Sequence, residues 1–592
     1  MSGLLVRTGR HLVLAEEFLA FLARHGDQKA ETVVSEGVQF FVSPLLLGGW
    51  CSGRALTPCA GTVVVLSGWL HNREELVKAL DAAPGCLDDE LAWAAYLHWG
   101  DQAWSKLAGE YILALWEDEN QTLRLITDHF GTRSLYWKLT DGELTAGSDI
   151  TTVAHSGERP RWDDTAIAHF LSFGRQLSQE RTEFLGVNRL PPAHLLRFCR
   201  GESQRVRYWV PPEPGYVVRS SQTQVEEFRE VMKSAVRARL RIGAVGFELS
   251  GGIDSTGLLA AAVELSPPSS LCAFTTGFSQ LPTDQEPALA ATTAAELGVT
   301  HRIIRFESEV EKVLSRELSP GSLVLNSPDS PWHYKFRAAR EFSPVLLCGD
   351  GGDPALGWSG WCDRSSGMRR QLANALQALH SHLRVWGPDI RNLGLRRRFL
   401  SMGRPALEHE LPPWLDKDYL RRCELGRAAQ REVDRFGEEA QRFGMTCSPF
   451  WNDLFRRRSP DATGTALLVS YPYFDQQVWK FLNSVPPLPW FRQKALARLA
   501  LRGRVREEIV TRPKTVASPF ADSSASLMRE HLSWFQGLWN AHRDILTFYL
   551  DREQLFHYLG NLQQLPFAQQ YQLLAAVRFM RWIESQSHSS LN

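Results

Sequence analysis

A glycine-rich turn between an apolar run and a helical run constrains the fold of this chain more than any other feature. The run Ala244–Leu249 (AVGFEL) has the length of a buried strand, and it leads through Ser250–Ser255 (SGGIDS) into an alanine- and leucine-rich segment typical of a helix. The first amides of such a helix have no partner within the helix, so they point into the turn and can bind phosphate. Two glycines let the backbone approach a ligand closely, and two serines add hydroxyl donors. The turn therefore predicts a phosphate site at the end of a strand.

An aspartate in this turn indicates that a metal ion accompanies the phosphate. Asp254 would repel a phosphate unless a cation lay between them, which favours Mg²⁺. A second turn, Leu346–Trp358 (LLCGDGGDPALGW), also runs from a strand into glycines and acids and carries Asp350 and Asp353. Asp254 and Asp353 could converge on one metal as oxygen ligands. Because neither turn has the lysine and spacing of a Walker loop or the three glycines of a dinucleotide fingerprint, we predict a different kind of magnesium nucleotide site.

Strand-like runs alternate with helical runs around these two turns. Such alternation predicts parallel βαβ units and a doubly wound sheet, whose ligands lie at the carboxyl ends of the strands. The expected strands are Ala244–Leu249, Leu271–Phe278, His301–Phe306 and Ser343–Asp350, and the expected helices begin near Ser255 or span Gln285–Leu297, Glu309–Glu317 and Tyr334–Glu341.

The first third of the chain has a different pattern, with short strand-like runs and one helical segment. At 592 residues the chain is too long for one ordinary core, and the proline-rich stretch Tyr208–Ser221 is the clearest boundary. We therefore expect an α+β domain over residues 1–210 and a second domain over residues 211–592. The expected strands of the first domain are Thr62–Leu70, Tyr111–Asp118, Thr122–Asp128 and Ser134–Asp149, and its helical segment is Asp88–Leu107.

Composition excludes several classes of protein. Lys+Arg and Asp+Glu both number 66, so the charge balance gives no reason to expect nucleic acid. No window approaches the ~18 apolar residues of a membrane span, and the nine cysteines are scattered singly, so we expect a cytoplasmic protein that binds no membrane. Most of the 20 tryptophans are expected in the core. The arginine runs at Gly394–Phe399 and Phe455–Pro460 are expected on solvated faces, with docking of an acidic peptide as the alternative.

The motifs resemble those of a known family. SGGIDS is similar to the pyrophosphate loop of the N-type ATP pyrophosphatases, and Gly349–Asp353 (GDGGD) resembles the second loop of their asparagine synthetase branch. The resemblance implies ATP and Mg²⁺ as cofactors. It also implies an α/β fold: an N-terminal Ntn-hydrolase-like αββα layered domain, and a C-terminal doubly wound, HUP-like ATP pyrophosphatase domain with a helical extension. Further similar stretches are Gly68–Leu76 and Thr127–Trp137 in the glutaminase-like domain, and Tyr471–Pro486 and Glu507–Thr515 in the synthetase domain.

The chain departs from the asparagine synthetases where they release ammonia from glutamine. Those enzymes use a cysteine directly after the initiator methionine, whereas this chain has Ser2 there and its nearest cysteine is Cys51. The start of the chain is also expected to lack the short apolar strand that would carry a terminal nucleophile into a site. The glutamine-binding sequence NGE of the family is replaced by Ser67–Trp69 (SGW). We therefore expect a glutaminase fold without glutaminase chemistry, and an amine from another source.

Two branches of the superfamily share that loss, the β-lactam synthetases and the lasso-peptide macrolactam cyclases. Asp350 stands where asparagine synthetases have glutamate and β-lactam synthetases have tyrosine, and the form GDGGD looks most like the lasso cyclases. The resemblance implies a macrolactam synthetase that adenylates a side-chain Asp or Glu of a ribosomal precursor peptide, whose N-terminal amine then closes the ring. It implies a leader-recognition protein and a leader peptidase as partners. The alternatives are a small-molecule cyclase, a glutamine-independent amide synthetase, and a non-catalytic nucleotide-binding scaffold.

Residue roles follow from the two turns and from the resemblance. Asp254 and Asp353 are the expected metal ligands. Lys514, matched by resemblance, would be a fixed cation over the reacting centre, assisted by Arg512. Asp350 is the expected base for the incoming amine, with its pKa raised by burial and by Asp353; a third metal ligand or a turn cap is the alternative. The expected ATP-binding residues are Leu249, Ser250, Gly251, Gly252, Asp254, Ser255, Phe274, Thr276, Cys348 and Gly349.

Overall fold

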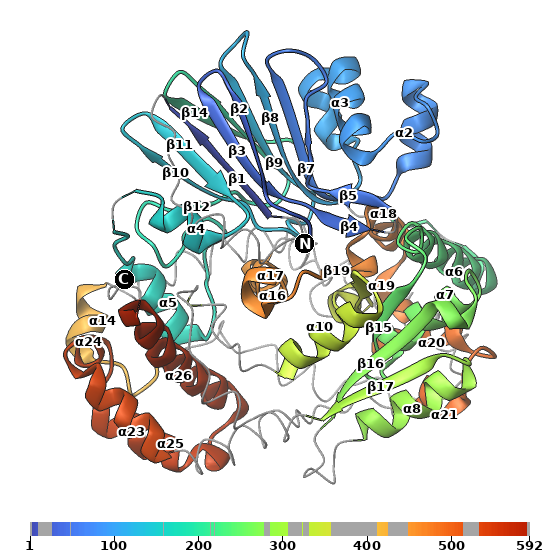
Figure 1. The fold of residues 1–592 in the computed structure, drawn as a ribbon. Helices are drawn as coiled ribbons and strands as arrows, with labels where there is room; N and C mark the ends of the chain where they lie inside the picture. The colour runs from blue at the N-terminus through green and yellow to red at the C-terminus, as the bar shows by residue number, and fades with distance from the viewer. Residues whose placement is uncertain are drawn as a thin grey trace, which may run out of the picture.

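Two antiparallel sheets of six strands form the N-terminal half, and a parallel sheet of five strands forms the centre of the C-terminal half (Figure 1). The computed structural model describes residues 3–9, 27–47, 49–157, 159–212, 215–217, 219–277, 285–305, 323, 331–356, 411–423, 448–512 and 532–588.

The two N-terminal sheets pack face to face, and helices cover their outer faces. The strand orders are β12-β10-β11-β1-β3-β2 and β14-β13-β9-β8-β7-β6. Apolar side chains of both sheets, such as Val6 and Ile112, form the core between them. Helices α2 and α3 pack on the second sheet, and α4, α5 and the C-terminal helix α26 share a core with the first. These four layers confirm the predicted αββα arrangement.

The elements of this half have the following bounds. The strands are β1 (Gly3–Thr8), β2 (Glu31–Ser35), β3 (Val38–Ser43), β4 (Leu45–Leu47), β5 (Trp50–Ser52), β6 (Ala55–Leu56), β7 (Thr62–Leu70), β8 (Gly109–Glu117), β9 (Thr122–Thr127), β10 (Tyr136–Thr140), β11 (Glu143–Gly147), β12 (Asn188–Arg189), β13 (His194–Cys199) and β14 (Glu202–Arg207). The helices are α2 (Arg73–Leu80), α3 (Asp88–Trp99), α4 (Ile150–His155) and α5 (Asp164–Phe173).

Strand β1 corrects one expectation, since the start of the chain does contain a short apolar strand. It pairs with β3 and β11, and Leu4, Leu5 and Val6 are all buried. Because the sheet is covered on both faces, the strand needs apolar side chains on both sides and shows no alternation. Six residues without alternation gave too weak a pattern to be recognised. Ser2 itself lies outside the described residues.

The C-terminal sheet has the order β17-β16-β15-β18-β19, and all its pairs are parallel. Its strands are β15 (Val245–Glu248), β16 (Leu271–Gly277), β17 (Thr300–Arg305), β18 (Val345–Leu347) and β19 (Leu468–Ser470). Helices α6 (Ser221–Arg237), α7 (Ile253–Val263), α8 (Glu286–Glu296) and α10 (Pro331–Phe342) pack around it. The doubly wound arrangement is thereby confirmed, while the helix expected at Glu309–Glu317 lies outside the described residues.

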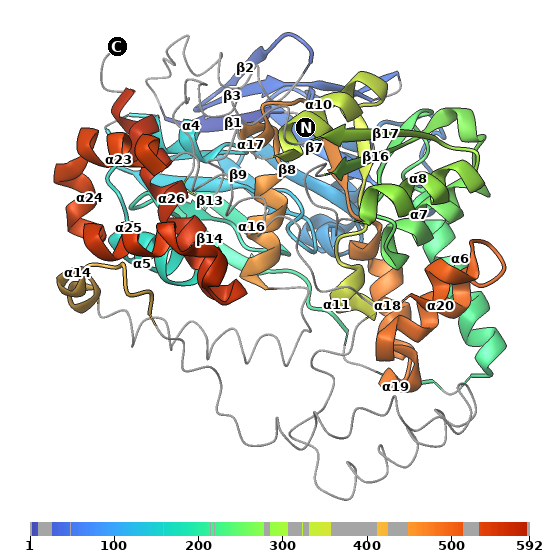
Figure 2. The same cartoon turned by 90° about the horizontal axis from the view of Figure 1, so that it is seen from below.

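Most of the remaining helices lie on either side of helix α16, with α23–α26 in a C-terminal cluster and α18–α20 beside the parallel sheet (Figure 2). Helix α16 (Pro449–Arg457) lies between the C-terminal helical cluster and the parallel sheet in both views. None of the described helices is long and apolar enough to span a bilayer. The other described helices are α11 (Gly352–Leu356), α14 (Lys417–Arg422), α17 (Pro460–Thr463), α18 (Gln476–Ser484), α19 (Pro487–Trp490), α20 (Ala495–Leu501), α21 (Glu507–Thr511), α23 (Leu532–Ala541), α24 (Arg543–Tyr549), α25 (Arg552–Gly560) and α26 (Phe567–His588).

The hydrophobic cores cross the boundary expected near residue 210. Trp69 and Phe130, from the N-terminal half, belong to the core around the parallel sheet. Tyr136 of β10 and Trp582 of α26 share a second core. The predicted core position of most tryptophans is confirmed for Trp69, Trp104, Trp116, Trp414, Trp539 and Trp582, whose side chains are almost fully buried.

Candidate active site

The structure brings the two glycine-rich turns together at the carboxyl edge of the parallel sheet. Strands β15 and β18 are direct neighbours, so the turns that follow them lie side by side. A Cβ atom on Gly352 would lie 2.4 Å from Cγ of Asp254, and one on Gly349 would lie 2.9 Å from the backbone nitrogen of Ser255. No larger residue fits there without movement of a loop, so these glycines hold the two turns in contact.

The first turn presents the amino end of helix α7. Gly252 is its N-cap, and the first helical hydrogen bond runs from the amide of Thr256 to the carbonyl of Gly252. The amides of residues 253–255 therefore point out of the first turn, where a phosphate can accept from them. Gly251 has φ +70°, a conformation that a side chain disfavours. The hydroxyl oxygens of Ser250 and Ser255 lie 3.2 Å apart beside it.

A lysine that the sequence analysis did not single out joins the two acidic turns. The ammonium of Lys494 forms ion pairs with Oδ2 of Asp254 and, at 2.7 Å, with Oδ1 of Asp353. Lys494 and the preceding Gln493 both have left-handed backbone conformations, with φ of 58° and 49°. Such conformations are costly for residues other than glycine and occur at functional sites. The only sequence signal is a basic residue directly before helix α20, which is too common to indicate a site.

The contacts of Lys494 also test whether a metal ion fits here. One cation reaches both carboxylates, so Asp254 and Asp353 converge as a divalent ion would require. Among the described residues no group of three or more His, Cys, Asp or Glu could hold a metal ion. Mg²⁺ commonly takes only one or two protein carboxylates and completes its shell with phosphates and water. The donor set therefore fits Mg²⁺ bound together with a nucleotide.

Asp350 lies at the end of a buried ionic cluster. One guanidinium nitrogen of Arg458 forms an ion pair with Asp350 at 2.6 Å, and the other forms an ion pair with Glu248 at 2.8 Å. Lys335 forms a further ion pair with Glu248 at 2.5 Å. Desolvation raises the pKa of the Asp350 carboxyl, Arg458 opposes this rise, and Glu248 adds to it. The neighbouring carboxylate that raises the pKa of Asp350 is thus Glu248, whereas the sequence analysis assigned this effect to Asp353. The two cations hold the pKa of Glu248 to about 2 despite its burial.

The arginine run at Phe455–Pro460 was expected on a solvated face, and this prediction is wrong. Arg456 is 0% exposed and Arg458 is 7% exposed. Arg456 forms an ion pair with Glu183 at 2.7 Å. The carboxylates that neutralise these arginines lie far away in sequence, so the run alone gave no sign that it would be buried.

The remaining expected site residues differ in their surroundings. Leu249, Phe274 and Cys348 are at most 1% exposed, so they can offer a nucleotide only their backbone, whereas Thr276 is partly exposed at the end of β16. Arg512 follows helix α21, and its amide donates to the carbonyl of Glu508. Lys514 lies outside the described residues, so its role stays a prediction.

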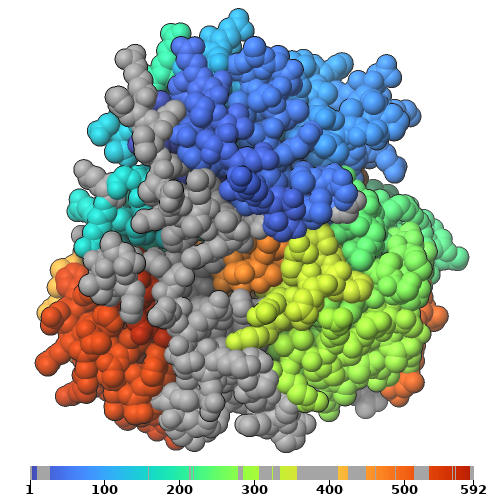
Figure 3. Space-filling model, viewed as in Figure 1, coloured from blue at the N-terminus to red at the C-terminus, as the bar shows by residue number. Residues whose placement is uncertain are grey.

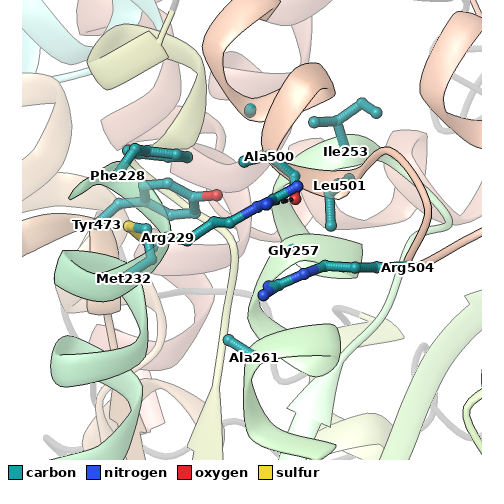
Figure 4. Close-up of a pocket in the computed structure, with 11 residues that line it drawn as sticks. Phe228, Arg229, Met232, Ile253, Gly257, Ala261, Tyr473, Ala500, Leu501 and Arg504 are labelled. Atoms are coloured by element: carbon teal, nitrogen blue, oxygen red, sulfur yellow. Dashed lines mark hydrogen bonds between the residues drawn. The ribbon is translucent and has the colours of Figure 1, made fainter. Parts of the chain in front are cut away.

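A small apolar cavity lies behind the first turn (Figure 4). Phe228 of α6, Gly257 of α7 and Leu501 of α20 line it, and Tyr473 reaches from it to donate a hydrogen bond to the carbonyl of Asp254 at 3.3 Å. The cavity holds about 30 Å³, which is room for one or two water molecules. It is too small for a nucleotide and supports the back of the turn instead.

The stretch that stands in place of the family's glutamine-binding sequence is buried in this structure. Trp69, the last residue of the Ser67–Trp69 stretch, is 0% exposed, and its indole nitrogen donates to Oε2 of Glu110 at 3.2 Å. Glu110 in turn pairs with Arg239, which is also fully buried. An indole and a buried ion pair thus occupy this part of the N-terminal half.

Comparison with known families places the chain. The family described as asparagine synthase matches residues 227–584, more than half of the chain, and the glutamine amidotransferase domain matches residues 55–209. The chain belongs to the asparagine synthase family.

Individual relatives in this family are distant. Asparagine synthetase [glutamine-hydrolyzing] 3 of Bacillus subtilis is 23% identical over 525 residues, which cover 83% of this chain and 81% of that protein. A putative asparagine synthetase of Mycobacterium tuberculosis (strain H37Rv) is 27% identical over 50% of this chain and 47% of its own length. Amidase chyE of Penicillium rubens is 29% identical over 42% of this chain. The match spans only 37% of that amidase.

Proposed function

We propose that this protein is an ATP-dependent carbon–nitrogen ligase that activates a carboxylate as its adenylate and releases pyrophosphate. The asparagine synthase match and the convergence of the two turns on Lys494 support this proposal. The β- and γ-phosphates would accept hydrogen bonds from the amides of residues 253–255. Asp254 and Asp353 would hold Mg²⁺, which neutralises charge on the phosphate oxygens when it is bound.

We further propose that the amine comes from the substrate itself, so that the product is a macrolactam. The observation that carries this proposal is the burial of Trp69 against Glu110, at the position where the family's glutamine-binding sequence was expected. The substrate would be a ribosomal precursor peptide of the lasso type, supplied by a leader-recognition protein and a leader peptidase. A side-chain carboxylate of Asp or Glu would be joined to the N-terminal amine that leader removal exposes.

The proposed reaction has two steps, adenylation of the carboxylate and ring closure by the amine. A carboxylate oxygen of the peptide attacks the α-phosphorus of ATP, and the bond to pyrophosphate breaks. The amine nitrogen then attacks the acyl carbon, its proton passes to Asp350, and AMP leaves. Lys514 and Arg512 are proposed to stabilise the negative charge that develops in both steps.

The test is a reaction of the purified protein with Mg·ATP and a leaderless peptide. We expect one AMP and one pyrophosphate per peptide, and a peptide product lighter by one water. Asp254→Ala should abolish the reaction, whereas Asp418→Ala, at an exposed carboxylate in α14, should not. A primary amide formed from ammonium or glutamine would overturn the macrolactam proposal, and so would pyrophosphate release with small amino-acid derivatives alone. Unchanged product formation by Asp254→Ala would indicate that the turn is only a scaffold.

A further inference from the structure

A fully buried ion pair joins the N-terminal sheets to the parallel-sheet half. Glu110, on β8, is 1% exposed, and Arg239, just after α6, is 0% exposed. Their charged atoms are 2.9 Å apart, and Arg239 also contacts Asp475 at 3.1 Å. Burial alone would raise the pKa of Glu110. The charge of Arg239 and the hydrogen bonds that Glu110 accepts lower that pKa to about 2. Glu110 is therefore ionised across the whole physiological range.

The same carboxylate holds the end of strand β19. Oε1 of Glu110 accepts a hydrogen bond from the hydroxyl of Ser470 and another from the amide of Tyr471, each at 2.9 Å. The carbonyl of Ser470 accepts from the amide of Cys348 at 3.0 Å. Cys348 stands two residues before Asp350. Two successive hydrogen bonds thus lead from Glu110 to the loop that carries Asp350.

A second connection reaches the cation that faces Asp350. Glu183 of the N-terminal half pairs with Arg456, and both side chains are 0% exposed. Arg456 stands two residues before Arg458, which contacts Asp350. Figure 3 shows the N-terminal half (blue) seated directly on the parallel-sheet half (yellow and green). The N-terminal half is therefore linked through Ser470 to the loop of Asp350, and through Arg456 to the segment that carries Arg458.

We propose that the N-terminal half sets the geometry of the Asp350 carboxylate, and that Glu110 is the positioning residue through which it does so. Apolar packing could hold the two halves together, but it would not fix the direction of Ser470 and Tyr471 as charge-assisted hydrogen bonds do. This inference rests on the proposed function, because it gives Asp350 a part in bond formation. Glu110 acts through the loop and touches no substrate.

The experiment compares Glu110→Gln with a matched variant, Arg241→Gln. Arg241 also joins the two halves, since it pairs with Asp88 at 2.6 Å. Its guanidinium lies over the ring of Trp69, but none of the described hydrogen bonds of the Arg241–Asp88 pair reaches Glu110 or β19. Amide hydrogen exchange of the full chain measures the loop directly and needs no substrate. We expect exchange over residues 346–352 to become about tenfold faster in Glu110→Gln and to stay unchanged in Arg241→Gln.

Turnover gives the second measurement, with Mg·ATP and the leaderless peptide. We expect kcat of Glu110→Gln to fall about 10- to 100-fold while KM for ATP changes less than about threefold, because misplacement of a reacting group affects the chemical step. Unchanged exchange over residues 346–352, equal loosening in both variants, or a change in KM alone would overturn the inference. If the wild type makes no product, the proposed function fails, and the exchange result still decides whether Glu110 positions the loop.

Glu110→Gln leaves Arg239 buried without its carboxylate and could therefore prevent folding, so a less disruptive variant is also tested. Ser470→Ala removes one donor to Glu110 and leaves the ion pair intact. We expect exchange over residues 346–352 to rise about threefold and kcat to fall about threefold. No change in either quantity would overturn the inference.

Discussion

At the scale of single residues, the proposed chemistry depends on the protonation of Asp350. A base must be ionised to accept a proton, so turnover should fall as the pH drops through the pKa of this carboxyl. Desolvation raises that pKa, and Arg458 is the first of the groups that lower it. Glu248, Lys335 and the thiol of Cys348 also face this carboxyl, while the pKa of the nearby Tyr471 hydroxyl lies far above neutrality.

The first prediction concerns Arg458→Met. Loss of the guanidinium raises the pKa of Asp350 further, so the pH below which kcat declines should move upward. The maximal kcat should fall about 100-fold, since loss of the contact with Arg458 leaves the Asp350 carboxylate misplaced. The measurement is kcat against pH with saturating ATP and peptide.

Arg457→Gln is the control, because Arg457 points away to the hydroxyl of Tyr571 at 3.0 Å. Its pH profile should match that of the wild type. An Arg458→Met profile that moved to lower pH would show that Asp350 does not titrate as the base.

The sequence revealed the site residues that belong to a local motif, and it did not reveal those whose partners are distant in sequence. Asp254, Asp353 and their glycines were found because each turn carries its own pattern of strand, glycines and acid. Lys494 reaches the same site from a segment with no pattern of its own, and Arg458 reaches it from an arginine run whose pattern indicated a solvated face. Their roles depend on carboxylates more than 100 residues away in sequence, and only the folded chain brings these groups together.

At the scale of elements, the site depends on how closely helix α11 approaches helix α7. The second prediction is that Gly352→Ala separates these two helix starts, since its Cβ would lie 2.4 Å from Cγ of Asp254. A displacement of about 1 Å should lower kcat/KM for ATP about 100-fold. The temperature of thermal unfolding should change little, because the loop can shift at the carboxyl ends of the strands.

Gly257→Ala, one turn further along α7, is the matched control. A Cβ there would lie 3.7 Å from the hydroxyl of Tyr473, an ordinary contact. Replacing a helical glycine by alanine should stabilise the protein by about 0.5–1 kcal/mol with kcat/KM unchanged. Equal losses of activity in both variants would refute the proposed contact between the turns.

The same scale explains which elements the sequence predicted. Strands β7, β15 and β16 and helices α8 and α10 were predicted within a few residues, because each is bounded by turn residues and has a clear apolar pattern. Strand β1 was missed because a strand covered on both faces has no alternation. Its short apolar run could be recognised only through its partners β3 and β11.

At the scale of the whole molecule, the fold class followed from the sequence, but the union of the two halves did not. Alternating strands and helices predicted the parallel sheet, and the proline-rich stretch predicted a boundary between two domains. The cores around Trp69 and Trp582 nevertheless draw residues from both halves. Glu110, Glu183 and their arginines add ion pairs that lie entirely between the halves. Contacts of this kind leave no periodicity in either segment.

The last prediction is that the described halves unfold together. The halves share cores and buried ion pairs, so the unfolding of one half would expose apolar surface and unpaired charge on the other. Calorimetry should therefore show one cooperative transition. Glu183→Gln leaves Arg456 buried without a carboxylate, which should cost about 3–5 kcal/mol and lower that single transition. Arg421→Gln breaks a pair whose side chains are 70–78% exposed and should change stability by less than about 0.5 kcal/mol. Two separate transitions, or an effect of Glu183→Gln confined to one of them, would show that the halves are independent domains and would remove the route by which the N-terminal half could position Asp350.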